Sequence, residues 1–427
     1  MSTKQTIILG KGVSGKAAHA LLEQQGKSSF CIDESTLTAE EFEQLLANTP
    51  FEQAVVSPGF SIDHHWVRAL GNRGIPLISE LELGWSYFSG KTIALTGSNG
   101  KSTAVKWICD ILRAQGVQAH IAGNYGIPIS QQVIDYPEAD WLVVEVSSFQ
   151  LECTHEFRPD IGVLLNLYPN HLNRHGSMET YAAMKARIFG QHHHNVRAIL
   201  PHALRENFAH LLAPKEEIVT FGIEENADVV ASAGHIHVSS GEAVDMQHTY
   251  FASGHLFEVT APAVVATIQA ATQCLDHISE TANQFQGLAH RYEWIKTYEG
   301  VEYINDSKAT NLAALAAGVA LPKKPVRLLA GGVLKEENVT FIKEILAERV
   351  VSIYLFGVSA TALKRAWSSV CHSNAYTTLE EAFEQAHQDA IAGEVILLSP
   401  GCASFDQYGS FEERGMHFIR LVEALEV

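Results

Sequence analysis

Residues 93–103 read Ile93-Ala-Leu-Thr-Gly-Ser-Asn-Gly-Lys-Ser-Thr103 and decide the fold of the central part of the chain. The apolar run Thr92–Leu95 predicts a buried strand, the glycines after it predict a tight loop, and a helical pattern follows to about Gln115. A glycine loop between a strand and a helix N-terminus directs several backbone N–H groups toward one point, and the helix dipole adds to that field. The stretch therefore predicts a phosphate-binding loop.

Two side chains of this loop suit a nucleotide. Lys101 is long enough to reach terminal phosphates, and the Ser102 hydroxyl stands where phosphate loops ligate Mg²⁺. The match is partial, because Leu95 stands where the pattern GxxxxGK[ST] has its first glycine. A bare Gly-Lys-Ser is common by chance, so other motifs must decide.

Several motifs accompany the loop in a fixed order. They are Glu145-Val-Ser-Ser-Phe-Gln-Leu-Glu152, His171 with Lys185, His290-Arg291, Asn305-Asp-Ser-Lys-Ala-Thr-Asn311 and Ser399-Pro-Gly-Cys-Ala-Ser-Phe-Asp-Gln407. Together with Thr96–Thr103 this set resembles the Mur ligases, and within them the branch that adds D-glutamate, from Gly10 to about Leu425. The resemblance implies an ATP-dependent amide ligase that joins D-glutamate to UDP-N-acetylmuramoyl-L-alanine through an acyl phosphate. It further implies a role in peptidoglycan precursor synthesis, and thus in cell wall biogenesis, cell shape and cell division.

The composition describes a globular protein of several domains. Of 427 residues, 46% are hydrophobic and 18% are charged, so we expect two or three cores. The formal net charge of −18 argues against a nucleic-acid partner. Six scattered cysteines without a CxxC pair predict reduced thiols. No signal-peptide pattern and no apolar run of about 18 residues is present, so we expect a cytoplasmic protein with no membrane span. We also expect a monomer.

Short apolar strands alternate with helical patterns, which predicts doubly wound α/β domains. Clear strands are expected at Thr6–Leu9, Trp141–Val146, Ile161–Asn166 and Glu394–Leu398. We place boundaries near residues 85 and 287. With the resemblance, three α/β domains follow: a dinucleotide-binding-like domain for the UDP substrate at 1–85, a central ATPase domain with the phosphate loop at 86–287, and a Rossmann-like D-glutamate-binding domain at 288–427.

A second glycine loop, Gly10-x-Gly12-x-x-Gly15, follows the first strand. Asp33 lies 18 residues beyond Gly15 at the end of the next strand, so the letters spell a dinucleotide-binding fingerprint. A dehydrogenase and a purely structural turn are therefore competing interpretations, although nothing downstream resembles a hydride-transfer site. In the family that the chain resembles, this domain holds the UDP part of the sugar substrate. The resemblance assigns UDP-substrate binding to Gly12, Val13, Ser14, Ser57, Pro58, Gly59, Asn124 and Ser147.

Glu145 ends a very apolar strand, where a carboxylate is costly unless it is paired or bound to a metal ion. Beside a Gly-Lys-Ser loop its obvious partner is Mg²⁺ on nucleotide phosphates, and the alternative is a carboxylate held by local backbone N–H groups. The resemblance implies His171 as a ligand of a second Mg²⁺. It also implies a CO₂ adduct on Lys185, a carbamate whose oxygens suit a hard cation; a solvated helix lysine is the alternative. The expected metal ligands are Ser102, Glu145, His171 and Lys185 as its carbamate.

The remaining site residues also follow from the resemblance. The ATP-binding residues are expected to be Gly97, Asn99, Gly100, Lys101, Ser102, Thr103, Arg291 and Asp306. The catalytic residues are expected to be Lys101, His171, Lys185 and Lys308. D-Glutamate is expected to contact Thr310, Lys335, Ser399 and Tyr408. Lys308 and Thr310 are two residues apart, a spacing that places them on one side of an extended segment.

Two positions depart from the usual family pattern. Asn173 replaces the aspartate of His-Leu-Asp-Arg-His, which puts a charge-based role there in doubt. Val333-Leu334 stands where an acidic or small residue is usual, so an exposed lysine is the alternative for Lys335. The run His192–His194 is expected to be a solvated loop. A related amide ligase, such as a folylpolyglutamate synthetase, and a non-catalytic UDP-sugar-binding protein are the other functions to be weighed.

Overall fold

The computed structural model describes residues 5–190, 196–211, 217–336 and 338–426. Its strands form three sheets with helices on both faces, which confirms the expected α/β architecture. Contacts divide the chain into two compact units, Met1–Leu167 with Arg174–Phe285 and Tyr168–Asn173 with Gln286–Val427. The boundaries near residues 85 and 287 stay a prediction.

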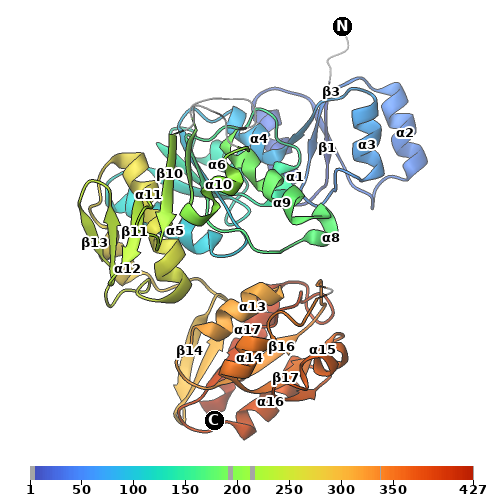
Figure 1. The fold of residues 1–427 in the computed structure, drawn as a ribbon. Helices are drawn as coiled ribbons and strands as arrows, with labels where there is room; N and C mark the ends of the chain where they lie inside the picture. Colours follow the sequence, from blue (N-terminus) through green and yellow to red (C-terminus); the bar gives the residue numbers. More distant parts are fainter. Residues whose placement is uncertain (1–4, 191–195, 212–216, 337, 427) are drawn as a thin grey trace. The chain divides into compact units, whose positions relative to one another are not determined.

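The first sheet has the strand order β2-β1-β3-β4, and all its strands are parallel. This part of the chain contains β1 (Gln5–Leu9), α1 (Val13–Gln24), β2 (Ser29–Ile32), α2 (Ala39–Asn48), β3 (Phe51–Val56), α3 (His65–Asn72), β4 (Leu77–Ser79) and α4 (Glu80–Ser86). Because side chains alternate along a strand, Ile7 and Leu9 face α2 and α3, whereas Ile8 faces α1. Figure 1 shows α1 on one side of β1, and α2 and α3 on the other.

The central sheet has the order β13-β12-β11-β10-β9-β8-β5-β7-β6. The strands from β11 to β6 are parallel, and β12 and β13 extend the sheet by antiparallel pairing. Its first half contains β5 (Lys91–Thr96), α5 (Lys101–Ala114), β6 (Ala119–Gly123), α6 (Ile129–Asp135), β7 (Trp141–Glu145), α7 (Ser148–Leu151), β8 (Ile161–Leu164), α8 (Leu172–His175), α9 (Met178–Ala186) and η1 (Arg187–Phe189). Its second half contains β9 (Arg197–Pro201), η2 (His202–Leu204), α10 (Arg205–Phe208), β10 (Glu217–Gly222), β11 (Val229–Ser232), β12 (His235–Val238), β13 (Ala243–Asp245), the π-helix η3 (Leu256–Thr260), α11 (Ala261–Thr272) and α12 (Ile278–Gln284).

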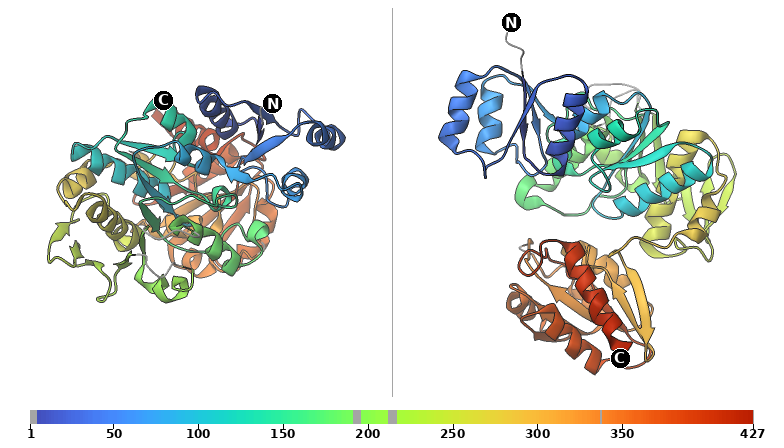
Figure 2. Two further views of the ribbon diagram at one scale, coloured as in Figure 1. Left: turned by 90° about the horizontal axis from the view of Figure 1, so that it is seen from above. Right: turned by 180° about the vertical axis from the view of Figure 1, so that it is seen from behind.

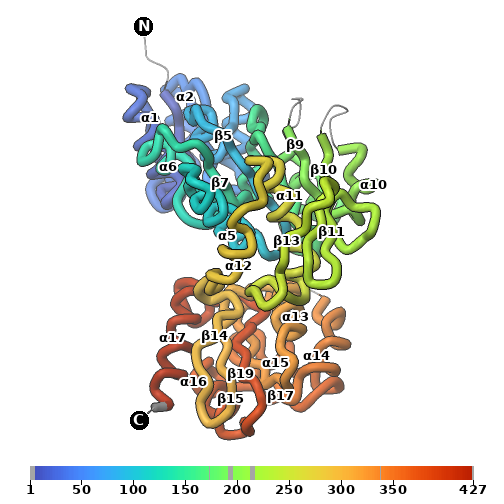
Figure 3. The backbone as a smooth tube through the Cα atoms, turned by 90° about the vertical axis from the view of Figure 1, so that its left-hand side faces the viewer, coloured from blue at the N-terminus to red at the C-terminus, as the bar shows by residue number. Residues whose placement is uncertain are grey.

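Two apolar layers enclose the central sheet. Ile93 and Leu95 of β5 face α5, α11 and α12, which Figure 3 shows together. Ala94 faces the opposite layer, which contains α1 and α6. Burying each large aliphatic side chain contributes about 1.5–3 kcal/mol. Ile8 and Val55 of the first sheet belong to this second layer, so the first and central sheets share one apolar core.

The C-terminal sheet has the order β14-β15-β19-β16-β17-β18, with only β14 antiparallel to its neighbour. It contains β14 (Glu293–Tyr298), β15 (Val301–Asn305), α13 (Leu312–Ala320), β16 (Val326–Gly331), α14 (Lys343–Arg349), β17 (Val350–Phe356), α15 (Ala360–Trp367), β18 (His372–Ala375), α16 (Leu379–Asp389), β19 (Val395–Leu398), α17 (Phe411–Glu423) and η4 (Ala424–Glu426). Helices α13, α14 and α15 pack on one face, and α16 and α17 on the other, where α17 is the red helix in the right-hand view of Figure 2.

One sequence expectation is met at this level. All six cysteines are free, as predicted. Within the described part of the chain, no helix has the length and apolar character needed to cross a membrane.

Candidate active site

The predicted phosphate loop joins β5 to α5. Gly100 is the N-cap of α5 and has a φ of 80°, a left-handed conformation that glycine adopts without a steric penalty. No described side chain caps this helix. The N–H groups of its first turn therefore point at the space above the loop, as in an anion-binding site.

Asn166 holds the loop in shape. Its Oδ1 accepts hydrogen bonds from the backbone N–H groups of Ser98 and Asn99, at 2.9 and 3.0 Å, and its Nδ2 donates to the Asn99 carbonyl at 3.0 Å. The expected strand Ile161–Asn166 was too long: β8 ends at Leu164, because the chain turns there to bring Asn166 to the loop. A polar residue two positions after a buried parallel strand is the signal that identifies this residue.

Two lysine side chains meet at the carbonyl of Gly97. The Lys101 Nζ donates to Gly97 O at 2.8 Å and to Ser98 O at 3.1 Å. The Lys185 Nζ donates to the same Gly97 carbonyl at 2.9 Å and to Thr96 Oγ1 at 3.1 Å. Lys185 is only 1% exposed, so the alternative of a solvated helix lysine is wrong.

The environment of Lys185 favours the neutral amine. Burial holds its pKa well below the usual lysine range, the neighbouring Lys101 ammonium lowers the pKa further, and the Glu145 carboxylate opposes both effects. The Nζ also lies 4.8 Å from the ring centroid of Tyr181, which forms one wall of the site. A neutral amine is the nucleophilic form of lysine.

Glu145 is 2% exposed and ends β7 beside the loop. The Ser102 hydroxyl donates to its Oε2, and Asn124 Nδ2 donates to its Oε1 at 2.6 Å. The structure therefore brings two of the predicted metal ligands together and places Asn124, a predicted substrate residue, on the same carboxylate. Three neighbouring parallel strands, β5, β7 and β6, end at this edge, which is where α/β sheets bind ligands.

The motif that follows Glu145 forms the short helix α7. Ser147 caps this helix: its hydroxyl accepts the Gln150 N–H at 3.3 Å and donates to Gln150 Oε1 at 2.9 Å. Ser148 Oγ lies 2.9 Å from Nε2 of His175. The hydroxyl of Ser147, a predicted substrate residue, is thus also a structural group.

His171 lies in the segment Tyr168–Asn173, which belongs by its contacts to the second unit. Its φ of 55° is left-handed, an uncommon conformation for a residue with a side chain. Backbone strain of this kind is concentrated at functional loops. Its role as a metal ligand stays a prediction.

A second candidate site lies where β1 and β3 end. A Cβ at Gly15 would lie 1.9 Å from the Gly10 carbonyl oxygen, so only glycine allows α1 to begin this close to β1. The Ser57 hydroxyl is buried and has no hydrogen-bond partner among the described residues. Leaving a buried hydroxyl unpaired costs about 1–3 kcal/mol, so this group is suited to a ligand. The other predicted residues of the two loops are Gly12, Val13, Ser14, Pro58 and Gly59.

In the C-terminal unit, Asp306 is hydrogen-bonded to another of the predicted residues. Its Oδ2 accepts a hydrogen bond from Ser399 Oγ at 2.8 Å, and its Oδ1 accepts one from the Tyr292 N–H at 3.2 Å. Burial raises the pKa of Asp306 to about 7, against the opposing effects of these hydrogen bonds and of the Arg291 guanidinium. The predicted ATP residue Asp306 and the predicted D-glutamate residue Ser399 therefore share one hydrogen bond.

Lys308 and Thr310 do not lie on the extended segment that we expected. The strand β15 ends at Asn305, whose Oδ1 accepts the Ser307 N–H at 3.2 Å and so bends the chain into a turn. The Lys308 Nζ lies 3.7 Å from the ring centroid of Phe411, where a cation is stabilised by about 0.5–2 kcal/mol. Phe411 is thus a neighbour of a predicted site residue that sequence analysis missed.

Arg414 is a second missed residue, and it is fully buried in α17. Its guanidinium donates to Ser307 Oγ and O, at 3.0 and 2.8 Å, and to Cys402 O at 3.1 Å. Burial lowers the pKa of Arg414 to about 10. One side chain thereby joins the two motifs that contain Ser307 and Cys402. A charged residue four positions before Phe418, on the apolar face of a helix, is the sequence signal for it.

Lys335 and Tyr408 are two of the residues predicted to contact D-glutamate. Lys335 is exposed, and Leu334 before it packs against the core around β16, which explains the apolar departure at this position. The Tyr408 hydroxyl lies 2.7 Å from Nδ1 of His417, and burial raises the pKa of Tyr408 to about 12. Contacts of either residue with D-glutamate stay a prediction.

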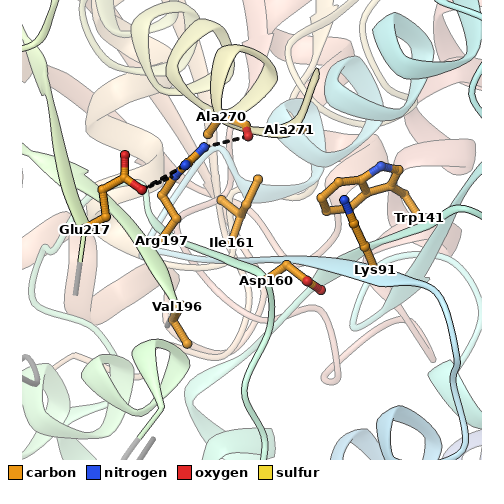
Figure 4. Close-up of a pocket in the computed structure, with 9 residues that line it drawn as sticks. All are labelled: Lys91, Trp141, Asp160, Ile161, Val196, Arg197, Glu217, Ala270 and Ala271. Carbon is orange, nitrogen blue, oxygen red and sulfur yellow. Dashed lines mark hydrogen bonds and ion pairs between the residues drawn. The ribbon is translucent and has the colours of Figure 1, made fainter. Parts of the chain in front are cut away.

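Two other features stand outside this site. The pocket in Figure 4 lies at the opposite edge of the central sheet, where β5 and β7 begin, and its Arg197 is engaged by Glu217 at 2.9 Å. Among the described residues, Glu34, His64 and His65 have ligand atoms near enough for one metal ion.

The geometry of that group disfavours metal binding. His64 Nδ1 accepts the Trp66 N–H at 3.2 Å, so Nε2 carries the ring proton and donates it to Glu34 at 2.8 Å. Neither ring nitrogen then has a free lone pair. The run His192–His194 lies outside the described residues.

Comparison with known proteins identifies the family. A family model described as the Mur ligase middle domain matches residues 95–264. The UDP-N-acetylmuramoylalanine–D-glutamate ligase of Koribacter versatilis is 33% identical over 99% of this chain and 98% of that protein. The protein of the same name from Bacillus subtilis is 31% identical, over 98% of this chain and 97% of its own. The chain belongs to the UDP-N-acetylmuramoylalanine–D-glutamate ligases.

Solved structures of other Mur ligases and of a folate enzyme share the fold. MurF ligase from Thermotoga maritima in complex with ADP has a TM-score of 0.62 and 16% identity, over 90% of this chain and 92% of that one. E. coli FolC in complex with DHPP and ADP has a TM-score of 0.60 and 16% identity, over 81% and 91%. The resemblance to the Mur ligases is confirmed, and membership of this family decides against a dehydrogenase.

Proposed function

We propose that this Mur ligase uses ATP to join D-glutamate to UDP-N-acetylmuramoyl-L-alanine, in the synthesis of peptidoglycan precursors. The relatives that match nearly its whole length carry the name of this activity. The observation that carries the proposal within the molecule is the meeting of Lys101 and Lys185 at Gly97, next to the pair of Ser102 and Glu145. This arrangement gathers two amines, a hydroxyl and a carboxylate around one phosphate loop.

The UDP part is proposed to bind at the first sheet. The N-terminus of α1 has no side-chain cap among the described residues, so its N–H groups suit a diphosphate. The unpartnered hydroxyl of Ser57 offers a hydrogen bond at the same edge. Asn124 and Ser147 lie in the central sheet's loops, where the acyl end of the substrate has to reach the ATP.

ATP is proposed to bind at the loop of residues 97–103. In the structure, the Lys101 ammonium rests on two loop carbonyls. Phosphate oxygens are stronger acceptors for an ammonium group than carbonyls are, so the γ-phosphate would draw Lys101 away from them. Arg291 and Asp306 are proposed to complete ATP binding from the C-terminal unit.

The residues present fit Mg²⁺. Ser102 and Glu145 supply a hydroxyl and a carboxylate oxygen side by side, which are hard donors suited to this ion. His171 and a carbamate on Lys185 are proposed to complete the ligands of two Mg²⁺ ions. The ions would supply charge neutralisation at the phosphate oxygens.

A carbamate on Lys185 is supported by burial as well as by position. Its amine is enclosed, its pKa is lowered by burial, and it lies beside the loop that would hold the phosphates. CO₂ adds to the nitrogen of a neutral amine, and the nitrogen loses one proton. The product turns a neutral amine into an anionic oxygen donor.

The reaction is proposed to pass through an acyl phosphate. An oxygen of the L-alanine carboxylate attacks the γ-phosphorus, and the bond to the ADP oxygen breaks. The D-glutamate amine, after losing a proton, attacks the carbonyl carbon, and inorganic phosphate leaves as the amide forms. Lys101 and Lys308 are proposed to neutralise oxygen charge as it develops. Thr310, Lys335, Ser399 and Tyr408 are proposed to hold D-glutamate.

The proposal is tested by coupled ADP release from purified protein with UDP-N-acetylmuramoyl-L-alanine, ATP and Mg²⁺. Release is expected with D-glutamate and not with L-glutamate or L-lysine, and the product should be the UDP-linked dipeptide. ADP release with L-lysine in place of D-glutamate would assign another amide ligase. Saturable UDP-substrate binding with no ADP release would favour a non-catalytic binding protein. The monomeric state and cytoplasmic location stay predictions.

A further inference from the structure

Arg174 makes an unusually complete set of contacts. Its Nε and Nη2 donate to the two carboxylate oxygens of Glu152, at 2.8 and 2.5 Å. Its Nη1 and Nη2 also donate to the backbone carbonyls of Pro58 and Phe60, at 3.3 and 3.0 Å. The guanidinium carbon lies 4.2 Å from the ring centroid of Phe149.

These contacts require an arginine, and its side chain is largely buried. The side chains of Arg174 and Glu152 are 18% and 3% exposed. A bidentate pair of this kind is stronger than a surface ion pair, and its two parallel bonds fix the orientation of the guanidinium plane. A lysine has neither the planar fork nor the stacking face, so it is no substitute here.

The partners of Arg174 lie in two segments that follow strands of two different sheets. Pro58 and Phe60 belong to the turn after β3, which is the proposed UDP-substrate turn. Glu152 and Phe149 belong to the motif that begins at Glu145, the proposed metal ligand. The apolar core that the two sheets share does not include this turn, and Phe60 packs instead against the core of the first sheet.

We propose that Arg174 is a positioning residue, which holds the turn Ser57–Phe60 against the Glu145–Glu152 motif and so fixes the span from the UDP site to the phosphate loop. The inference rests on the proposed function. The reacting acyl group is attached to the UDP that this turn would hold, so the turn sets how far the carboxylate reaches toward the γ-phosphate. A misplacement of about 1 Å can cost on the order of 100-fold in rate.

The first test is the kinetics of Arg174→Ala. We expect kcat to fall on the order of 100-fold and KM for the UDP substrate to rise, while KM for ATP keeps its wild-type value. Arg174→Lys is expected to behave like Arg174→Ala. The matched control is Arg158→Ala, because Arg158 is an exposed arginine that also lies on an aromatic ring, 5.9 Å from the centroid of Trp85. This variant should keep wild-type kinetics.

The second test does not depend on activity. Hydrogen exchange of the backbone amides at residues 57–64 reports the turn directly, including the Phe60 N–H that donates to Ser57 O at 3.0 Å. Exchange there is expected to accelerate in both Arg174 variants and not in Arg158→Ala, with β5 and α5 unchanged.

The outcomes separate this inference from the proposed function. Wild-type kcat in Arg174→Ala would overturn the positioning role. Accelerated exchange throughout the first unit, with a lower Tm, would overturn it in favour of a general structural role. If the wild-type protein releases no ADP, the proposed function fails, and the exchange at residues 57–64 alone decides whether Arg174 holds the turn.

Discussion

At the scale of single residues, the Gly97 carbonyl is the feature around which the central site is built. Two lysines that are far apart in sequence donate to this one oxygen, and one of them is buried. The sequence motifs predicted both lysines as site residues, but they did not predict that both would donate to one carbonyl oxygen. Their convergence depends on how α9 packs against the loop, which the local pattern around Lys185 does not encode.

Replacing Lys185 with alanine tests its proposed carbamate. The variant would lack one oxygen donor for the metal, and such metal stabilisation is worth several kcal/mol, so ADP release should fall by at least about 100-fold. Because the site is enclosed, a small carboxylic acid has a defined space to enter. Acetate or propionate should therefore restore part of the activity, measured as ADP release against acid concentration.

The same assay needs a lysine control and a stability control. Lys106, on the outer part of α5, pairs with Asp110 at 2.6 Å and is partly exposed, so Lys106→Ala should keep its activity. Lys185 is buried, and its removal leaves a void, so the Tm of Lys185→Ala has to be measured alongside. Full activity of Lys185→Ala without added acid would refute the carbamate.

At the scale of elements, strand ends were more predictable than the turns that follow them. A carboxylate at the end of the apolar strand β7 and a glycine loop after β5 are visible in the sequence because each interrupts a run of buried residues. The end of the strand before Asn166 and the turn after β15 were mispredicted. In both places a short polar side chain bends the chain, and the sequence does not distinguish such a residue from one that belongs to a strand. Arg414 was missed because most of its partners are backbone carbonyls, which leave no trace in composition, and the other is the Ser307 hydroxyl.

The buried start of α4 gives a prediction about pH. Glu80 is 2% exposed, its Oε1 accepts the Ser130 N–H at 2.7 Å, and burial raises its pKa to about 7. The folded protein therefore binds a proton that the unfolded chain releases above about pH 4.5. The free energy of unfolding should fall as pH rises from about 4.5 to about 7, by up to about 3 kcal/mol from this group.

Glu80→Gln removes that ionisation and keeps an oxygen acceptor for Ser130. Its free energy of unfolding, relative to wild type, should therefore rise between pH 5 and pH 8 in urea titrations. Glu40→Gln, an exposed first-turn glutamate of α2, is the matched control and should run parallel to wild type over this range. Parallel curves for Glu80→Gln and wild type would contradict the buried, raised-pKa carboxyl.

At the scale of the whole molecule, each sheet presents its candidate residues at the carboxyl ends of parallel strands. The family motifs predicted candidate residues in loops whose order along the chain follows the order of the sheets, and which substrate each sheet binds stays a prediction. The shared core between the first and central sheets was not predictable, since Ile8, Val55 and Ala94 look like ordinary strand residues. The Arg174 contacts that span these two sheets escaped the sequence for the same reason.

The last prediction follows from this separation of sites. Lys101 donates to the loop after β5, whereas the UDP candidate site is formed by the ends of β1 and β3, so the two binding reactions should be separable. Lys101→Ala should lose at least about 100-fold in ADP release, since it removes a charge that acts on the transferring phosphate. In isothermal titration without ATP, Lys101→Ala should still bind UDP-N-acetylmuramoyl-L-alanine with wild-type affinity. Neither the wild-type protein nor this variant should bind NADH saturably. Near wild-type ADP release by Lys101→Ala would contradict the assignment of this loop to ATP. Loss of UDP-substrate binding by the same variant would contradict the independence of the two binding sites.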